Sequence, residues 1–478
     1  MGVRITDTGP AAVHGRLASL ILAAAAARAS VRRWLGNERR QWGARLIVGV
    51  LDQGIASGMN FAVSILLARW MPESGYGAFS VAFACFLFVS GFHTALLLDP
   101  VSVLGPARHW ARLPAYFSDV VRLHCAWTAA ASAAIAGAAF LIPRGRVTPA
   151  LAGLAAMLPF LLLFWLVRRF CYVAGKPRLA LASSMVYAPA LLVTLLVLRW
   201  RGMLSSVTAL LAIGLASAVA SAIVWARLGL GCAMRAAAWR SALRLGESHW
   251  GYGKWLAAAA LLSLGITHVQ TLLAAGSMGL EAAAALRALL NFALPLAQLV
   301  TVVAVLAVPE LSADYAAGRT RQVRKKGIAI MAGLAACAAA YETALVLFAE
   351  PLESALYGGK FVARWQLIPV LGLLPVFAAL ATGPSIVLQA MQKPQHYLIR
   401  GALTAPVGIT SALLFTHWWG LTGMAASMVL TYATATLATW WLYRLYVSRE
   451  EAGQQKPAVL RAPGACIAGR AEFREAAS

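Results

Sequence analysis

Charged side chains are scarce in this 478-residue chain, in which Asp, Glu, Lys and Arg together make up 12% of the residues. Soluble domains carry roughly 25% charged residues, so this shortage excludes an ordinary water-soluble protein. Hydrophobic residues make up 61% of the chain instead. A water-soluble fold cannot bury that much apolar surface, and we therefore expect an integral membrane protein.

The sequence also lacks the residue spacings of a metal site or a disulfide framework. None of the six cysteines belongs to a CxxC motif or has a histidine at ligand spacing. His93, His124 and His268 have no second candidate ligand three or four residues away. We interpret these cysteines and histidines as packing residues, and we expect no metal and no cofactor.

The apolar residues come in long continuous runs, of which 81–98 and 151–167 are examples. A run of about 20 residues crosses a hydrocarbon core of ~30 Å as a helix. The alternating segments of a membrane barrel are absent. We therefore predict an all-α integral membrane protein with about twelve transmembrane helices. The predicted spans are 43–69, 77–98, 117–142, 148–173, 179–198, 203–226, 250–275, 281–308, 327–348, 365–390, 396–418 and 421–446.

Loops rich in lysine and arginine alternate along the chain with loops that contain few of them, as expected when successive loops lie on opposite sides of a membrane. With both termini in the cytoplasm, the cytoplasmic segments hold 33 of the 41 basic residues and the outer segments hold 7. One further residue, Arg287, is assigned to the interior of a span. This topology accounts for the net charge of +24, so we expect no nucleic-acid partner.

Two weak internal repeats indicate that the chain has two related halves. Residues 174–177 resemble 391–394, and residues 73–78 resemble 281–286. Both pairs relate a span to the one six places later, so we predict two six-helix lobes of the same orientation. The predicted parts are a basic cytoplasmic segment 1–42, an N-terminal lobe 43–228, a cytoplasmic connector 229–249, a C-terminal lobe 250–446 and a polar cytoplasmic tail 447–478.

Ionisable residues at membrane depth are costly and usually face a cavity or one another. Asp52 lies in the first span, and Ser57 and Asn60 follow it near one helical face. Ion-coupled transport and a structural hydrogen bond between helices both explain such an aspartate. Asp99, near the end of the second span, and Glu342, in the ninth, are further candidates for ion coupling. Asp99 can also simply cap or end its helix.

Arg287 lies about two turns into the eighth span, and Asn291, Pro295 and Gln298 continue its face at spacings of three or four residues. A guanidinium at this depth can bind a phosphate or carboxylate through two parallel hydrogen bonds. We therefore expect Arg287, Asn291 and Gln298 to line a substrate cavity. The alternative is a buried ion pair of Arg287 with Asp52 or Glu342.

The first two spans also contain a series of short motifs: Asp52-Gln53, Ser57-Gly58, Asn60-Phe61, Ala68-Arg69, Pro72-Glu73, Gly75-Tyr76-Gly77 and Leu97-Leu98-Asp99-Pro100. Later motifs are Arg287, Asn291-Phe292, Pro295, Pro309-Glu310-Leu311, Tyr357-Gly358-Gly359-Lys360-Phe361 and Trp418-Trp419-Gly420-Leu421-Thr422-Gly423. Together they resemble bacterial polysaccharide flippases, which are the O-antigen and exopolysaccharide exporters of the MOP transporter superfamily. The likeness spans residues 43–446.

The resemblance implies a transporter without enzymatic activity. Such a protein flips an undecaprenyl-diphosphate-linked oligosaccharide from the inner to the outer leaflet by alternating access, for surface polysaccharide assembly. In this family a cationic cavity receives the diphosphate; Arg287 is the match at membrane depth, and Arg69 is a second candidate. The implied location is the bacterial inner membrane, with lipid-linked oligosaccharide, membrane lipids and polysaccharide assembly proteins as partners.

Two other functions compete with this interpretation. A MATE-like multidrug exporter coupled to protons or sodium has the same fold, but it would favour acidic cavity groups over Arg287 for cationic drugs. A membrane-embedded polysaccharide polymerase or glycosyltransferase would need a sizeable aqueous loop. The longest outer loop expected here, residues 349–364, is too short for one.

The uneven distribution of basic residues predicts that both termini lie in the cytoplasm. Reporter domains fused after Val447 should be active only when the reporter functions in the cytoplasm. Activity only of a reporter that functions on the outer side would contradict this topology.

Overall fold

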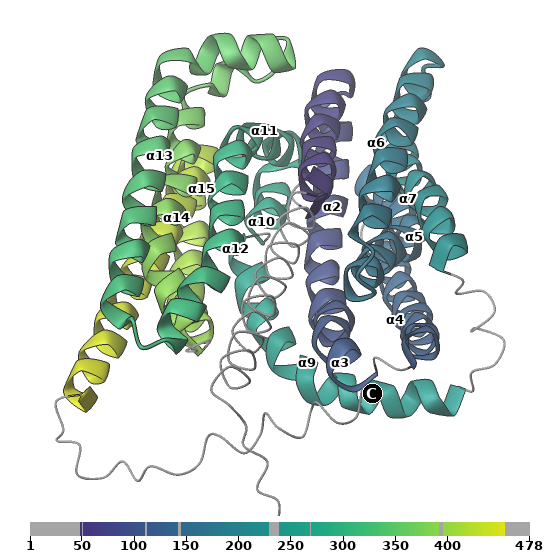
Figure 1. Ribbon diagram of the computed structural model, residues 1–478. Coiled ribbons are helices and arrows are strands. Elements are labelled where there is room, and N and C mark those ends of the chain that lie inside the picture. The colour runs from purple at the N-terminus through teal and green to yellow at the C-terminus, as the bar shows by residue number, and fades with distance from the viewer. Residues whose placement is uncertain are drawn as a thin grey trace, which may run out of the picture. The chain divides into compact units, whose positions relative to one another are not determined.

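The computed structural model describes residues 48–49, 51–109, 112–141, 145–228, 239–267, 269–391 and 395–454. Almost all of these residues are helical, and none of them lies in a strand (Figure 1). The segment 1–42 and residues 455–478, which the sequence predicts to be cytoplasmic, lie outside the described residues. The predicted all-helical fold class is confirmed.

Ten of the described helices are long and apolar enough to cross a membrane. The last of them belongs to α15 (Gln395–Gln454), in which the backbone leaves helical geometry at Gly420, with φ 55° and ψ −131°. Glycine adopts such a positive φ without steric cost. The break falls between the predicted spans 396–418 and 421–446, so α15 contains both of them.

The predicted seventh span falls on α9 (Trp239–Thr267) and α10 (Val269–Met278). α9 begins inside the predicted connector 229–249, so residues 239–249 are helix rather than loop. Its buried residues Ala242, Leu245 and His249 recur at helical spacing, while Arg240 and Arg244 are exposed. This is the pattern of an amphipathic helix, which the charge count alone does not distinguish from a loop.

The described chain forms two compact units, and their members are not contiguous in sequence. Unit 1 comprises Met1–Asn291 and Glu350–Trp365, and unit 2 comprises Phe292–Ala349 and Gln366–Ser478. Contacts define these units, whereas the predicted lobes follow span order and internal repeats. The two-lobe organisation with a connector at 229–249 therefore stays a prediction.

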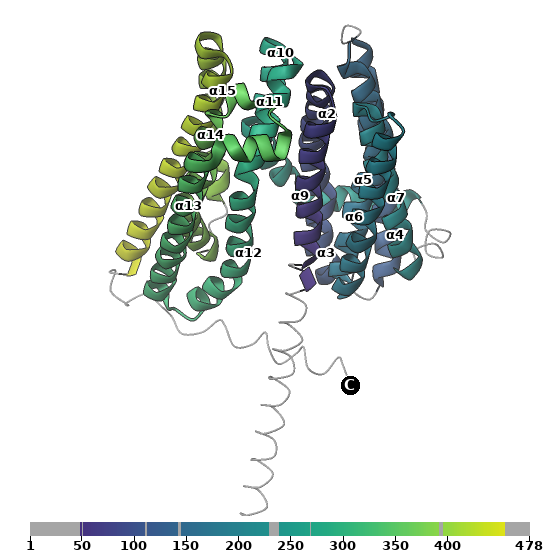
Figure 2. The ribbon, with the colours of Figure 1, turned by 90° about the horizontal axis from the view of Figure 1, so that it is seen from above.

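Unit 1 begins with a helix over Leu51–Trp70 and contains most of the described helices. The others are α2 (Glu73–His93), the π-helix η1 (Thr94–Leu98), α3 (Asp99–Arg108), α4 (Leu113–Leu141), α5 (Val147–Val173), α6 (Pro177–Trp200), α7 (Ser206–Leu228), α9, α10 and α11 (Leu280–Leu290). In Figure 2, α4, α5, α6 and α7 lie side by side in one group.

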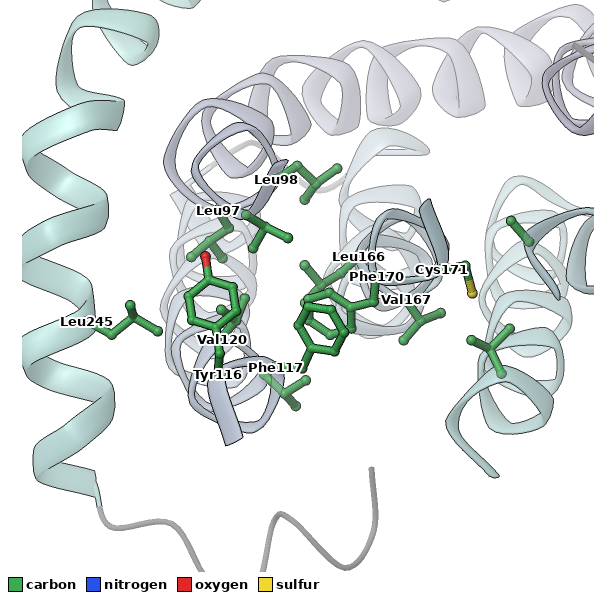
Figure 3. Packing of buried hydrophobic residues seen from close by; sticks show 14 residues of the cluster. Leu97, Leu98, Tyr116, Phe117, Val120, Leu166, Val167, Phe170, Cys171 and Leu245 are labelled. Carbon is green, nitrogen blue, oxygen red and sulfur yellow. The ribbon is translucent and has the colours of Figure 1, made fainter. Parts of the chain in front are cut away.

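The core of unit 1 lies where α5 packs against its neighbours. Phe117 on α4 stacks on Phe170 on α5, with ring centroids 4.0 Å apart. Leu97, Val167 and Leu245 belong to the same buried cluster, which therefore joins η1, α5 and α9 (Figure 3). Thirteen of the residues of α5 are buried, so this helix is the central element around which the others are arranged.

Close helix packing positions α11 against α2. A Cβ atom at Gly77 on α2 would collide with the carbonyl oxygen of Leu280 at the start of α11. Only glycine permits this approach, because the obstacle is backbone and cannot rotate away. The approach brings the face of α11 that carries Arg287 against the aromatic residues of α2.

Unit 2 contains α12 (Leu294–Ala316), α13 (Thr320–Tyr357) as far as Ala349, α14 (Leu367–Ala390) and α15. Figures 1 and 2 both place α13, α14 and α15 side by side. The short 3-10 helix η3 (Asn291–Ala293) leads into α12, and a second one, η4 (Val362–Arg364), precedes α14.

A charge cluster joins α12 to α13 at the turn between them. Lys326 pairs with Glu310 and with Asp314, the latter at 2.9 Å, and Arg319 pairs with Asp314 at 2.5 Å. Lys326 and Arg319 hold the pKa of Asp314 below its usual value. The stabilisation from this carboxylate is therefore present above its unfolded pKa of about 3.9, and it is lost only as the pH falls through the lower folded value.

The contact between α2 and α11 predicts that Gly77→Ala destabilises the protein, because the new methyl group must push two backbones apart. We expect a loss of roughly 1–3 kcal/mol, measured by thermal unfolding of the purified protein. Gly137→Ala on α4 is the matched control, since a Cβ there meets nothing within 4 Å. An unfolding temperature for Gly77→Ala equal to that of the control would contradict this account.

Candidate functional site

Asp52 is completely buried and accepts hydrogen bonds from three side chains of α5 and α6. Arg168 Nη2 donates to Oδ2 over 2.7 Å, and the Tyr172 hydroxyl donates to the same oxygen. The Ser184 hydroxyl donates to Oδ1 over 2.5 Å. The carboxylate thus holds together three helices of unit 1, and its charge is balanced by Arg168.

The partner of Asp52 corrects two sequence predictions. Asp52 pairs with Arg168 and not with Arg287, so the alternative of an Asp52–Arg287 ion pair is wrong. Arg168 lies inside α5 with a side chain 12% exposed, so Arg287 is not the only arginine within a span. The predicted span 148–173 includes Arg168, but the charge count placed this arginine among the cytoplasmic basic residues because it lies near the end of the span. Its spacing of four residues from Tyr172 was the available signal of a shared helical face.

The other polar residues of the first helix do not join Asp52. Gln53 donates to Ser57 over 3.1 Å at an exposed position, and Asn60 is exposed. The residues that share the buried face of Asp52 are Ala56, Met59 and Val63. The first helix therefore separates a buried carboxylate from a polar stripe that includes Asn60.

Asp99 does not end its helix. The chain continues from η1 directly into α3 as far as Arg108, with Pro100 in the first turn of α3. Proline lacks an N–H group but is tolerated in the first turn of a helix, so the chain passes through Pro100 without ending the helix. Asp99 is half-buried and lies close enough to Arg169 to interact with it electrostatically.

Glu342 and Gln298 belong to unit 2. Glu342 lies on α13, its buried Oε2 atom has no hydrogen-bond partner, and a Cβ atom at Gly372 on α14 would collide with it. Gln298 is exposed on α12. Arg287, Asn291 and Gln298 are therefore not on one continuous helix face, because η3 interrupts the helix between the last two.

Arg287 lies on α11 among aromatic residues of unit 1. Its guanidinium carbon is 5.0 Å from the centroid of the Phe83 ring on α2. It is also close enough to Tyr76 and Tyr357 to interact electrostatically with their hydroxyl groups. Within the described part of unit 1, no carboxylate forms an ion pair with Arg287, and its buried Nε atom has no hydrogen-bond partner.

Asn291, one helical turn beyond Arg287, is buried, and only one of its two side-chain polar atoms has a hydrogen-bond partner. Its Nδ2 atom donates to the Tyr357 hydroxyl over 3.0 Å, and that hydroxyl donates to the carbonyl oxygen of Ala288 over 2.8 Å. The Oδ1 atom of Asn291 is buried without a partner. Arg287 and Asn291 therefore present one unused donor and one unused acceptor in the same region of unit 1.

The segment Glu350–Trp365 completes this region, although the chain on both sides of it belongs to unit 2. Glu353, Tyr357 and Phe361 are buried at intervals of four residues. Lys360 Nζ donates to the carbonyl oxygens of residues 68, 69 and 71, over 3.1, 2.7 and 2.6 Å, and so caps the end of the first helix.

Arg69 is exposed and donates to the carbonyl oxygen of Ala355 over 2.9 Å. It therefore serves in this structure to attach the segment Glu350–Trp365. The sequence motif 357–361 pointed to this segment, but nothing local in the sequence indicated its contacts with residues almost 300 positions earlier.

The buried ion pair predicts that Asp52→Asn destabilises the protein, because Arg168 loses its counter-charge. Breaking a buried pair costs about 3–5 kcal/mol, so we expect low yields and a lower unfolding temperature. The double variant Asp52→Asn with Arg168→Gln should recover part of the loss. A normally folded Asp52→Asn protein whose export no longer depends on a proton or sodium gradient would instead support ion coupling.

Comparisons with known proteins place this geometry in a known fold. No protein-family model and no curated protein matches the sequence. Among solved structures, an inward-facing multidrug resistance MATE family transporter of the MOP superfamily is similar over 85% of this chain and 99% of its own, with a TM-score of 0.71 and 13% identity.

Two further structures extend the likeness. The lipid II flippase MurJ, in an inward closed conformation, matches over 83% of this chain and 87% of its own, with a TM-score of 0.67 and 12% identity. A eukaryotic MATE transporter matches over 87% and 98%, with a TM-score of 0.61 and 16% identity. The chain therefore has the membrane-transporter fold that MATE transporters and MurJ share.

Proposed function

We propose that this protein transports a lipid-linked oligosaccharide, carried on a polyprenyl diphosphate such as undecaprenyl diphosphate, from the inner to the outer leaflet of a bacterial inner membrane. Transport proceeds by alternating access, for surface polysaccharide assembly. The fold is common to a lipid II flippase and to multidrug exporters, so it supports transport without selecting the substrate. Both termini are cytoplasmic in this proposal, and assembly proteins are partners.

The observation that carries the proposal is an arginine without a carboxylate partner in unit 1. Burying a cation is costly unless it is paired, so an unpaired Arg287 at membrane depth calls for an anionic ligand. Its guanidinium can bind a diphosphate through two parallel hydrogen bonds, which a cationic drug does not offer. Phe83 stabilises the same cation through its ring face when no ligand is present.

The remaining candidates have secondary roles in the proposal. Asn291 binds beside Arg287, and Asn60 and Gln298, both exposed, contact the sugar portion as it passes. Arg69 contributes positive charge near the segment Glu350–Trp365. In the proposed mechanism the substrate is moved across the membrane without breaking any of its bonds.

A second candidate function is export of organic cations coupled to an ion gradient, as in a MATE transporter. Glu342 favours it, because this carboxyl group has a buried oxygen without a hydrogen-bond partner. Ion coupling is compatible with either substrate, and Glu342 is a better candidate than Asp52, whose charge is balanced. Asp99 remains a third.

Replacement of Arg287 separates the two functions. Arg287→Gln should abolish flipping of the lipid-linked glycan at near-normal protein levels, and Arg287→Lys should retain part of it because the charge remains. Loss of a charge-assisted hydrogen bond of about 1.5–3 kcal/mol corresponds to roughly 10- to 100-fold weaker binding. Binding to the purified protein and flipping in reconstituted vesicles would be measured.

Arg201→Gln is the matched control, because Arg201 also lies against an aromatic ring but is exposed at the end of α6. It should flip the glycan normally. Normal flipping by Arg287→Gln would rule out the diphosphate contact. Loss of cation export by Glu342→Gln, together with no glycan binding by the wild type, would establish the exporter instead.

A further inference from the structure

The eighth predicted span is broken at the boundary between the two units. α11 ends at Leu290, η3 follows, and α12 begins at Leu294. The unit boundary falls between Asn291 and Phe292, within η3. A stretch of 3-10 helix inside a longer helix often marks a hinge. The break therefore includes Asn291, whose amide group lies one helical turn beyond Arg287.

Two tyrosines of α13 bind the chain on either side of this break. Tyr357 donates to the carbonyl oxygen of Ala288 in unit 1 over 2.8 Å. Tyr341 donates to the carbonyl oxygen of Phe292 in unit 2 over 2.7 Å. Between the two tyrosines α13 itself passes from unit 2 to unit 1, next to Pro351. Helix α13 thus binds the chain on both sides of the break at η3.

The Tyr357 hydroxyl, with the Tyr76 side chain also in contact with Asn291, determines which end of the Asn291 amide remains free. A phenol has one proton to donate, and Tyr357 gives that proton to Ala288. It can then only accept from Asn291, which must turn Nδ2 toward it. Oδ1 is left over, and with Arg287 Nε it makes up the pair of buried atoms without partners.

We infer that Asn291, with its amide orientated by the positioning residue Tyr357, recognises a hydroxyl group of the sugar next to the diphosphate bound by Arg287. This inference rests on the proposed function and adds to it the residue that distinguishes a glycosylated diphosphate from a bare one. A phosphate oxygen can accept a hydrogen bond from Arg287. Oδ1 of Asn291 is itself an acceptor and therefore needs a ligand group that donates a hydrogen bond. A sugar hydroxyl beside a phosphate supplies both partners, and a bare polyprenyl diphosphate supplies only one.

Both atoms are closed off from solvent in this structure, so a ligand reaches them only after the side chains around them move. Tyr357 contacts the Asn291 amide, whereas Tyr341 contacts the backbone of Phe292. We therefore expect only Tyr357 to set selectivity.

The test compares binding of two lipids to the purified full-length protein in nanodiscs: a polyprenyl diphosphate carrying a disaccharide, and the same diphosphate without sugar. We expect the wild type to bind the glycosylated lipid about three- to tenfold more tightly, the value of one hydrogen bond. Tyr357→Phe and Asn291→Leu should lose this preference while still binding the bare diphosphate.

Tyr341→Phe is the matched control, because it also removes a hydroxyl that donates to a carbonyl group at the break. It should keep the binding preference, because Tyr341 does not contact Asn291. Should Tyr357→Phe fail to fold, Asn291→Leu provides the same comparison. Equal binding of both lipids by the wild type, or an unchanged preference in Tyr357→Phe, would overturn the inference alone. Binding of neither lipid by the wild type would overturn the proposed function as well.

Discussion

The cost of a charge without a partner in hydrocarbon governs the polar groups of this protein. Three hydrogen bonds, one of which is the ion pair with Arg168, offset that cost for Asp52 and join three helices. Arg287 meets it only partly, through the face of Phe83. The fold supplies hydrogen-bond partners and a counter-charge for Asp52, whereas it leaves Arg287 without a counter-charge in unit 1.

Much of the fold follows from the sequence, because hydropathy depends on single residues and the spans are long. The helical class and most of the spans could be predicted on that basis. The break at Gly420 falls where the sequence predicted one span to end and the next to begin. The 3-10 turn η3 lies inside the predicted span 281–308 and was not predicted. α9 was read in part as a connector because its basic residues, exposed on one face, resemble a loop in composition.

Less of the candidate site could be predicted, and the reason is sequence distance. Arg287 and Asn291 share a short motif with helical spacing, so local pattern identified them. Tyr357 lies 66 residues from Asn291 along the chain, and no periodicity links the two. Arg168 was missed for a different reason: it lies near the end of an apolar run, where hydropathy cannot separate a buried arginine from one in a loop.

The discontinuity of unit 1 has a consequence for how the protein is made. Its last part, Glu350–Trp365, is synthesised after most of α12 and α13, which belong to unit 2. During translation the earlier helices of unit 1 are present while Lys360 does not yet cap the end of the first helix and Tyr357 does not yet bind the Asn291 amide. Assembly of the N-terminal half is therefore not finished before the C-terminal half has begun to insert, and a chain arrested within α13 before Tyr357 would lack both contacts.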